Sequence, residues 1–249
     1  QPTSHVFVLD CSLSMRQILS GVSAFSVAKR QLLQLIDEME PEDNAQLVLA
    51  GRRPTFVLPS LSYDTADLRR RLADLECGYG GGNIPAALSE ALWSLQGSAL
   101  PQRRVYVLTD GQSEGWRSGD TGAWDELRTE YADLDVKPMI LAIVARLPGR
   151  AGNVAVSGLS CVPPLADMVR STFFLCEIRN YSDSQTRTVV RFEVDGEAVS
   201  EREATLSPGS NELRFEHRFE KPGSHYVLAS VGEDLLGGDN RRGLALQVM

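Results

Sequence analysis

The sequence is poor in the residues from which zinc sites and disulfide scaffolds are built. It has four cysteines and three histidines among 249 residues. No two cysteines form a Cys-x-x-Cys pair and the histidines lie far apart, which argues against a structural zinc site. Cys161 and Cys176 could pair across two neighbouring strands, but two buried thiols are the preferred interpretation. The cysteine count leaves the redox compartment open.

Positive charge is also scarce, and so are long apolar runs. The 25 Lys and Arg residues are outnumbered by 33 Asp and Glu, giving a net charge of −8. This balance disfavours nucleic acid or an anionic membrane as the main partner. No stretch resembles a transmembrane segment or a signal peptide. Because the chain begins almost inside its first expected strand, we expect a longer parent protein whose membrane segments lie outside this chain.

In the first half, short apolar runs alternate with stretches of helical periodicity. Strands are expected at 5–9, 45–50, 55–58, 104–109 and 138–144, and helices at 23–39, 65–75, 84–95 and 123–132. Alternating strands and helices with apolar strand runs predict an α/β domain with a doubly wound, Rossmann-like parallel sheet. We place this domain at residues 1–149.

The second half changes character and shows no helical periodicity. Seven short alternating runs are expected as strands, at 154–159, 172–179, 187–194, 198–206, 212–219, 225–231 and 243–248. Asp195-Gly196 between two of these runs predicts a hairpin turn. Residues 150–249 are therefore expected to form an all-β, immunoglobulin-like sandwich. The linker at 148–152 is short, which predicts limited reach between the domains.

Two polar motifs follow expected strands of the first half. Asp10-Cys-Ser12-Leu-Ser14 comes directly after the first strand, and Thr109-Asp110-Gly111 ends the strand expected beside it. Ligands bind at the carboxyl ends of the strands in open α/β sheets. A carboxylate and two hydroxyls at alternate positions can converge on a hard cation, which prefers oxygen ligands. Asp10, Ser12, Ser14 and Asp110 are therefore the candidate metal ligands.

These paired motifs, in this order on a βα pattern, resemble the von Willebrand factor A domain over about residues 3–146. The resemblance implies a metal-ion-dependent adhesion site, in which Mg²⁺ or Mn²⁺ is held by such residues and a carboxylate of the partner completes its shell. The family usually supplies a further threonine ligand. Here Gly82 stands in its place within Gly80-Gly-Gly-Asn-Ile84, and the resemblance then implies weaker metal binding. Asn83 is an additional candidate ligand, although Pro85 favours its use as a helix cap.

The whole chain also resembles a narrower group of bacterial membrane-anchored proteins of the aerotolerance-operon type. The residues that carry this resemblance are Leu49-Ala-Gly-Arg-Arg53, Ser62-Tyr-Asp64, Arg104-Val-Tyr-Val-Leu-Thr-Asp110 and Asp239-Asn-Arg-Arg242. In that group a CARDB-like, immunoglobulin-type domain follows the A domain. The resemblance implies an extracytoplasmic location and a parent protein anchored in the membrane.

An enzymatic role is disfavoured. Ser12 and Ser14 lack a Gly-x-Ser-x-Gly elbow and a recognisable histidine partner. The glycines at 78–82 lack the Gly-Lys-Ser/Thr ending of a P-loop, so a tight turn before a helix is preferred. The hypothesis is therefore a non-enzymatic interaction or adhesion module that binds a protein or peptide with an acidic group through a divalent cation. Trp116, after Asp110, is a candidate partner-binding residue, and ordinary packing is the alternative.

Two other functions remain open at this point. One is a metal-independent structural scaffold with a vestigial metal site. The other is a hydrolase using a metal-bound water, for which the sequence offers no general base at a defined position.

Overall fold

The computed structural model describes residues 1–147, 152–162 and 166–249. The chain divides into two compact units, Gln1–Pro148 and Gly149–Met249. The predicted linker at 148–152 lies outside the described residues except for Gly152. Among the described helices, none is long and apolar enough to cross a membrane.

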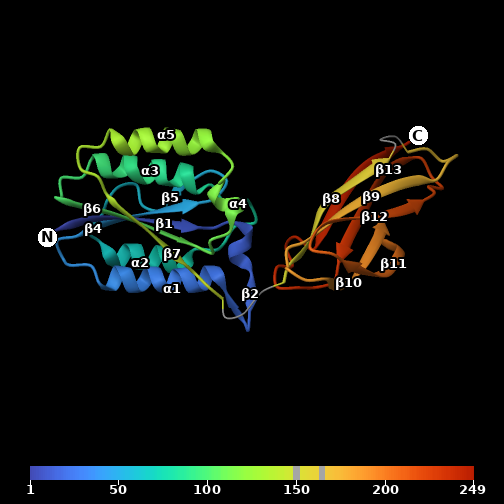
Figure 1. Ribbon diagram of the computed structural model, residues 1–249, viewed down its shortest axis with the longest axis horizontal. Coiled ribbons are helices and arrows are strands. Elements are labelled where there is room, and N and C mark those ends of the chain that lie inside the picture. The colour runs from blue at the N-terminus through green and yellow to red at the C-terminus, as the bar shows by residue number, and fades with distance from the viewer. Residues whose placement is uncertain (148–151, 163–165) are drawn as a thin grey trace. The chain divides into compact units, whose positions relative to one another are not determined.

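The first unit is built on a five-stranded sheet with the order β5-β4-β1-β6-β7 (Figure 1). Its strands are β1 (Thr3–Asp10), β4 (Asn44–Ala50), β5 (Thr55–Phe56), β6 (Gln102–Thr109) and β7 (Met139–Val144). The pairs β1·β4, β1·β6 and β6·β7 are parallel, whereas β5 runs antiparallel to β4. The predicted doubly wound sheet is confirmed, with an antiparallel strand at one edge.

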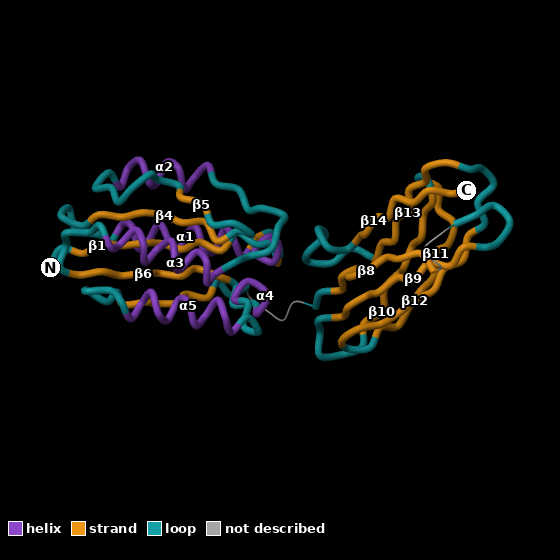
Figure 2. Tube along the Cα trace, turned by 90° about the horizontal axis from the view of Figure 1, so that it is seen from above, coloured by secondary structure: helices purple, strands orange, loops and turns teal. Residues whose placement is uncertain are grey.

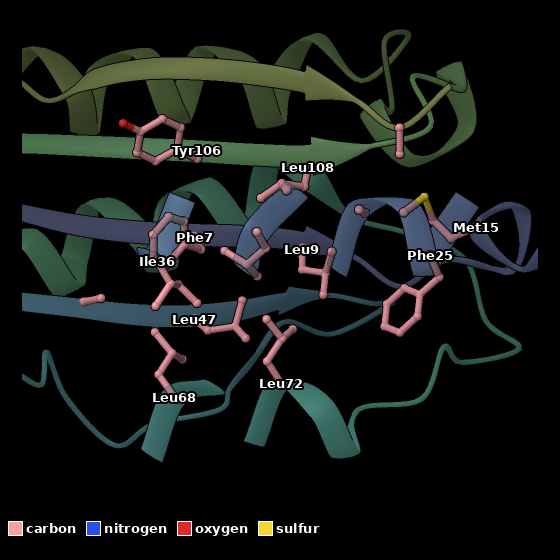
Figure 3. Packing of buried hydrophobic residues seen from close by; sticks show 14 of the residues in the cluster. Phe7, Leu9, Met15, Phe25, Ile36, Leu47, Leu68, Leu72, Tyr106 and Leu108 are labelled. Atoms are coloured by element: carbon pink, nitrogen blue, oxygen red, sulfur yellow. The ribbon is translucent and has the colours of Figure 1, made fainter. Parts of the chain in front are cut away.

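Helices cover both faces of this sheet, as Figures 1 and 2 show. One face carries α1 (Ala24–Asp37) and α2 (Thr65–Asp74), and the other carries α3 (Ile84–Gln96) and α5 (Thr121–Ala132). Under α1 and α2 lie Phe7 of β1 and Leu47 of β4, and Leu72 of α2 packs into the same core; all three are fully buried (Figure 3). Val105 and Val107 point to the opposite face, against α3 and α5. The apolar strand runs are thus buried because both of their faces are covered.

Local capping explains where the helices begin. Ser23 and Ser26 form a reciprocal capping box at the start of α1. Asn83 accepts a hydrogen bond from the amide of Ala86 at the start of α3, with Pro85 in the first turn. Each cap satisfies amide groups that a helix leaves without an internal partner.

Several expectations for the first unit are corrected. The strand expected at 55–58 is only two residues long, because Pro54 and Pro59 flank a segment that runs antiparallel on the sheet edge. The first strand begins two residues earlier than the expected 5–9, at Thr3, and His5 within it is buried and hydrogen-bonded to Asp43. The loop expected after Asp110 contains a short helix. The short elements not foreseen are η1 (Leu13–Arg16), β2 (Ile18–Leu19), β3 (Val22–Ser23) and α4 (Ser113–Trp116).

The edge strand β7 is unusually exposed for an apolar strand. Its six residues are all apolar, yet Met139 is 58% exposed and Leu141 is 39% exposed. In the described part of the chain, β7 pairs only with β6 and leaves its outer edge open. The apolar run at 138–144 therefore predicts a strand correctly, but not the burial that such a run normally indicates.

The second unit consists of two antiparallel sheets. Its strands are β8 (Val154–Val162), β9 (Thr172–Asn180), β10 (Thr186–Val194), β11 (Glu197–Leu206), β12 (Gly209–His217), β13 (Gly223–Val231) and β14 (Arg241–Val248). One sheet has the order β11-β10-β13-β14 and the other β12-β9-β8. Phe174, Phe192 and Phe215 lie buried in the shared core, with the rings of Phe192 and Phe215 stacked 4.8 Å apart. The predicted all-β sandwich is confirmed.

The hairpin turn and the two cysteines of this unit can also be compared with the sequence predictions. Asp195 and Gly196 connect β10 to β11 with φ angles of 52° and 86°, as a two-residue hairpin turn of type I′ requires. Cys176 is buried, and Cys161 lies on the neighbouring strand β8. Within the described residues no disulfide joins these two cysteines, and Cys161 is only partly buried, so the burial expected of both thiols is found for Cys176 alone.

Candidate metal centre

Asp10 occupies the centre of the candidate site at the carboxyl end of β1. Strands β4 and β6 flank β1, so the Asp10 side chain is enclosed and only 1% of the residue is exposed. One carboxylate oxygen, Oδ1, accepts a hydrogen bond from the Ser12 amide at 2.9 Å. The other, Oδ2, accepts one from the Thr109 hydroxyl at 2.8 Å. Asp10 therefore organises both the loop that follows it and the end of β6.

The two serines of the loop lie close to each other. The hydroxyl oxygens of Ser12 and Ser14 are 3.1 Å apart. Ser12 occupies the N-cap position of η1, but its hydroxyl caps no backbone amide of that helix. The loop is held from the other side by a hydrogen bond of 2.8 Å from the Leu13 amide to the Gly80 carbonyl. The loop therefore holds the two hydroxyls beside each other at the carboxyl end of β1.

Asp110 brings a second carboxylate to the same end of the sheet. Its Oδ1 accepts a hydrogen bond from the Gln112 amide at 3.0 Å. Its Oδ2 is buried and has no hydrogen-bond partner within the described residues. Burial raises the pKa of Asp10, hydrogen bonds from Ser12 and Thr109 oppose this rise, and the nearby charge of Asp110 adds to it. Two neighbouring carboxylates, one with an unsatisfied buried oxygen, form an environment that favours a cation.

The donor atoms fit a hard divalent cation. Across the residues described, no group of three or more His, Cys, Asp or Glu side chains gathers at one point, so hydroxyl oxygens would have to contribute. The Cys77 thiol is a poor ligand, because a metal binds the thiolate and this thiol stays protonated. Burial, and to a lesser extent the charge of a Cys11 thiolate, raises the pKa of Cys77 to about 12. The Cys77 thiol instead donates to the Ser12 carbonyl at 3.2 Å. A set of oxygen donors suits Mg²⁺ or Mn²⁺ rather than a thiolate-bound metal.

Gly82 lies directly against this site, and neighbouring atoms fill most of the space that a side chain at this position would occupy. A β-carbon on Gly82 would stand 3.3 Å from Asp10 Oδ1 and 3.2 Å from the β-carbon of Ser12. It would also stand 3.1 Å from the α-carbon of Gly115, which belongs to α4. Helix α4 thus occupies the volume that a larger residue at position 82 would need. The glycine that replaces the expected threonine is accommodated by the packing around it.

The remaining predicted site residues have other contacts. The Asn83 side-chain oxygen caps α3 by accepting from Ala86 at 3.3 Å, which is the alternative that Pro85 favoured. Trp116 is half-buried, with its ring stacked 6.2 Å from that of Trp124. The indole N–H of Trp124 donates to the Trp116 carbonyl at 3.2 Å. These contacts fix α4 beside Asp10 and give Trp116 a packing role.

Two residues of the site had no role assigned from the sequence: Thr109, which was noted only as part of its motif, and Gly115. Thr109 bridges Asp10 and the Gly111 amide through its hydroxyl, with distances of 2.8 and 3.1 Å. The parallel pairing of Leu9 with Leu108 places Thr109 beside Asp10; the sequence predicted that the two strands are neighbours but not this register. Gly115 is buried, and a β-carbon there would stand 3.4 Å from Asp10 Oδ2. No local sequence pattern marks Gly115.

Comparison with known proteins identifies a family that this part of the chain matches. Residues 5–112 match the family model of the von Willebrand factor type A domain. No curated protein matches the chain.

Among solved structures, conserved hypothetical protein BatB from Bacteroides thetaiotaomicron is 18% identical, covering 57% of this chain and 66% of that one, with a TM-score of 0.43. An aerotolerance-related membrane protein from Bacteroides fragilis is 21% identical, covering 56% and 67%, with a TM-score of 0.42. The CARDB domain of a Pyrococcus furiosus protein, solved with di-metal ions, is 17% identical, covering 42% and 94%, with a TM-score of 0.37.

The family match spans β1, both site motifs and the end of β6, which together hold Asp10, Ser12, Ser14 and Asp110. The first unit of this chain therefore carries a von Willebrand factor type A domain.

Proposed function

We propose that this chain is a non-enzymatic interaction module that binds an acidic group of a partner protein or peptide through a divalent cation. The observation that carries the proposal is the buried Oδ2 of Asp110, which has no hydrogen-bond partner among the described residues and lies near the buried carboxylate of Asp10. A cation would satisfy this oxygen and offset the repulsion between the two carboxylates.

Each residue has a distinct role in this proposal. Ser12, Ser14 and Asp110 would hold Mg²⁺ or Mn²⁺ directly. The two carboxylate oxygens of Asp10 already accept hydrogen bonds from Ser12 and Thr109. Asp10 would therefore position the loop and would coordinate the metal either directly or through a water molecule. The bound cation would supply an open coordination position for a carboxylate. Because Gly82 offers no hydroxyl, we expect a weaker site than one with a full set of protein ligands.

One observation favours a second candidate, a metal-independent scaffold. The α-carbon of Gly115 occupies space next to Gly82 and Asp10, so the site is closed on the side of α4. In a scaffold, Asp10 would serve only to join β1, η1 and β6 through its hydrogen bonds. The two candidates differ in one measurable property, which is cation-dependent binding of a carboxylate.

A labelled peptide with a single central glutamate provides the test. Its binding is measured by fluorescence anisotropy in Mn²⁺ and again in excess EDTA, beside a peptide with glutamine at the same position. The proposal predicts saturable binding of the glutamate peptide that EDTA and Asp110→Asn both abolish. Binding that is equal for the two peptides, or that survives EDTA, would instead support the scaffold.

The second unit is proposed to act as a spacer or as an additional contact surface. The proposed setting is the extracytoplasmic side of a bacterial membrane, with anchoring segments outside this chain. Protease accessibility of the parent protein in intact cells and in spheroplasts would test that setting.

A further inference from the structure

Helix α3 carries a large aromatic residue on its outer face that the core does not need. Trp93 is 65% exposed, although its neighbour Leu92 is buried against the sheet. The Trp93 ring lies 6.2 Å from the ring of Phe56 on the edge strand β5, tilted by 48°. The other two tryptophans, Trp116 and Trp124, are half-buried and packed together. An exposed tryptophan beside a second ring is a feature of binding surfaces.

The aromatic pair borders a cavity of about 560 Å³ that opens to solvent. Its other lining residues include Ser89, Glu90, Gln96 and Glu130. Glu130 comes from α5, whereas the other three lie on α3, so the cavity uses two helices and the edge of the sheet. A cavity of this size can accept a long side chain together with part of its backbone.

The charge of the cavity has one sign. Glu90 and Glu130 line it, and no Lys or Arg does. Within the described residues, neither carboxylate forms an ion pair. Other acidic residues of the same unit do so: Asp67 pairs with Arg71, and Asp125 pairs with Arg128. Two unpaired carboxylates beside an exposed indole produce a local environment that attracts a cation.

We infer that this cavity, the Trp93 cavity, binds an arginine side chain of a partner protein. A planar guanidinium stacks on an indole face and donates to carboxylates through its fixed fork of N–H groups. Trp93 and Phe56 provide the aromatic surface, and Glu90 and Glu130 provide the acceptors. The same two carboxylates repel an anionic lipid surface, which selects a basic protein segment as the occupant.

The Trp93 cavity is separate from the candidate metal centre. Trp93 lies nine residues after Ile84, which at 1.5 Å per residue is about 14 Å along α3 from the helix end beside Gly82. Arginine binding therefore does not rest on the proposed function, and the Asp110→Asn variant should leave it unchanged.

The test uses N-acetyl-arginine methylamide as the probe and N-acetyl-citrulline methylamide as its neutral isostere. The three tryptophan indole N–H signals are followed in the ¹⁵N-labelled chain of residues 1–249, with Trp93→Phe used to assign the Trp93 signal. We expect the arginine probe to shift the Trp93 signal saturably and to leave the Trp116 and Trp124 signals in place. The citrulline probe should be at least fivefold weaker, which corresponds to about 1 kcal/mol.

A double variant, Glu90→Gln with Glu130→Gln, provides the matched control. It keeps both rings and the side-chain volumes, and its unchanged Trp116 and Trp124 signals will show that the fold is intact. The inference predicts at least fivefold weaker arginine binding in this variant. Equal shifts from arginine and citrulline, unchanged affinity in the double variant, or no Trp93 shift at any soluble concentration of the arginine probe would each overturn the inference.

Discussion

The close packing around Gly82 leads to a sharp prediction for Gly82→Ala. The added β-carbon would meet the α-carbon of Gly115 at 3.1 Å, the β-carbon of Ser12 at 3.2 Å and Asp10 Oδ1 at 3.3 Å. Two of these neighbours are backbone or are attached to it, and the third belongs to a carboxylate held by two hydrogen bonds. Because none can rotate away freely, we expect overpacking to destabilise the first unit by about 1–3 kcal/mol.

The assay can isolate the first unit, because all three tryptophans of the chain lie within it. Urea unfolding followed by tryptophan fluorescence therefore reports on this unit. With an m value of about 2 kcal/mol/M, a loss of 2 kcal/mol lowers the midpoint by about 1 M. Gly81→Ala is the matched control, since a β-carbon there meets nothing within 4 Å. Equal midpoints for the Gly82→Ala and Gly81→Ala variants would refute the packing argument.

Three further predictions concern other parts of the chain. Ser23→Ala removes one half of the capping box of α1 and should cost about 1 kcal/mol in the same urea assay, while an unchanged midpoint would show that the box contributes nothing. A hydrogen bond to Asp195 raises the pKa of His225, so the pair should stabilise the second unit below the ordinary histidine pKa of about 6.5 and lose that contribution as pH rises through the raised value. Calorimetry of the second unit should show this loss in the unaltered protein but not in His225→Gln, and identical pH profiles would contradict it. Leu141→Lys on the exposed strand β7 should lower the urea midpoint by an amount that corresponds to less than about 1 kcal/mol, whereas a large loss of stability would show that β7 is buried in solution.

Much of the fold follows from the sequence because its elements have clear periodicity. The apolar runs at β1, β4 and β6 are continuous, as expected for strands covered on both faces. Asp195-Gly196 specifies its hairpin because both residues tolerate the positive φ angles that a type I′ turn requires.

The elements that were not foreseen are too short to have a period. Helix α4 has four residues, so its apolar pattern carries no information, although it determines how Gly115 packs against Asp10. The exposure of β7 was also not foreseen. An apolar run indicates that a strand can be buried, but only the arrangement of neighbouring elements determines whether it is covered.

In the candidate site, too, the sequence predicts some features and leaves others undetermined. Asp10 ends β1, Ser12 and Ser14 follow it, and Asp110 follows the neighbouring strand β6, so their placement at one end of the sheet could be predicted from the expected strand order. The role of Thr109 depends on the exact register between β1 and β6, which apolar runs alone do not specify. The closure of the site by Gly115 depends on tertiary packing and leaves no local signal.

The central claim is that Ser12, Ser14 and Asp110 hold a divalent cation, and calorimetric titration with Mn²⁺ and Mg²⁺ tests it most directly. The metal-free protein is compared with Asp110→Asn, which keeps the shape of the side chain but removes its charge. We expect saturable, single-site binding that Asp110→Asn abolishes, while the tryptophan-monitored urea midpoint of this variant stays at or above that of the unaltered protein. Absence of binding up to about 10 mM metal, beyond the range of weak protein cation sites, or equal binding by both proteins, would contradict the account.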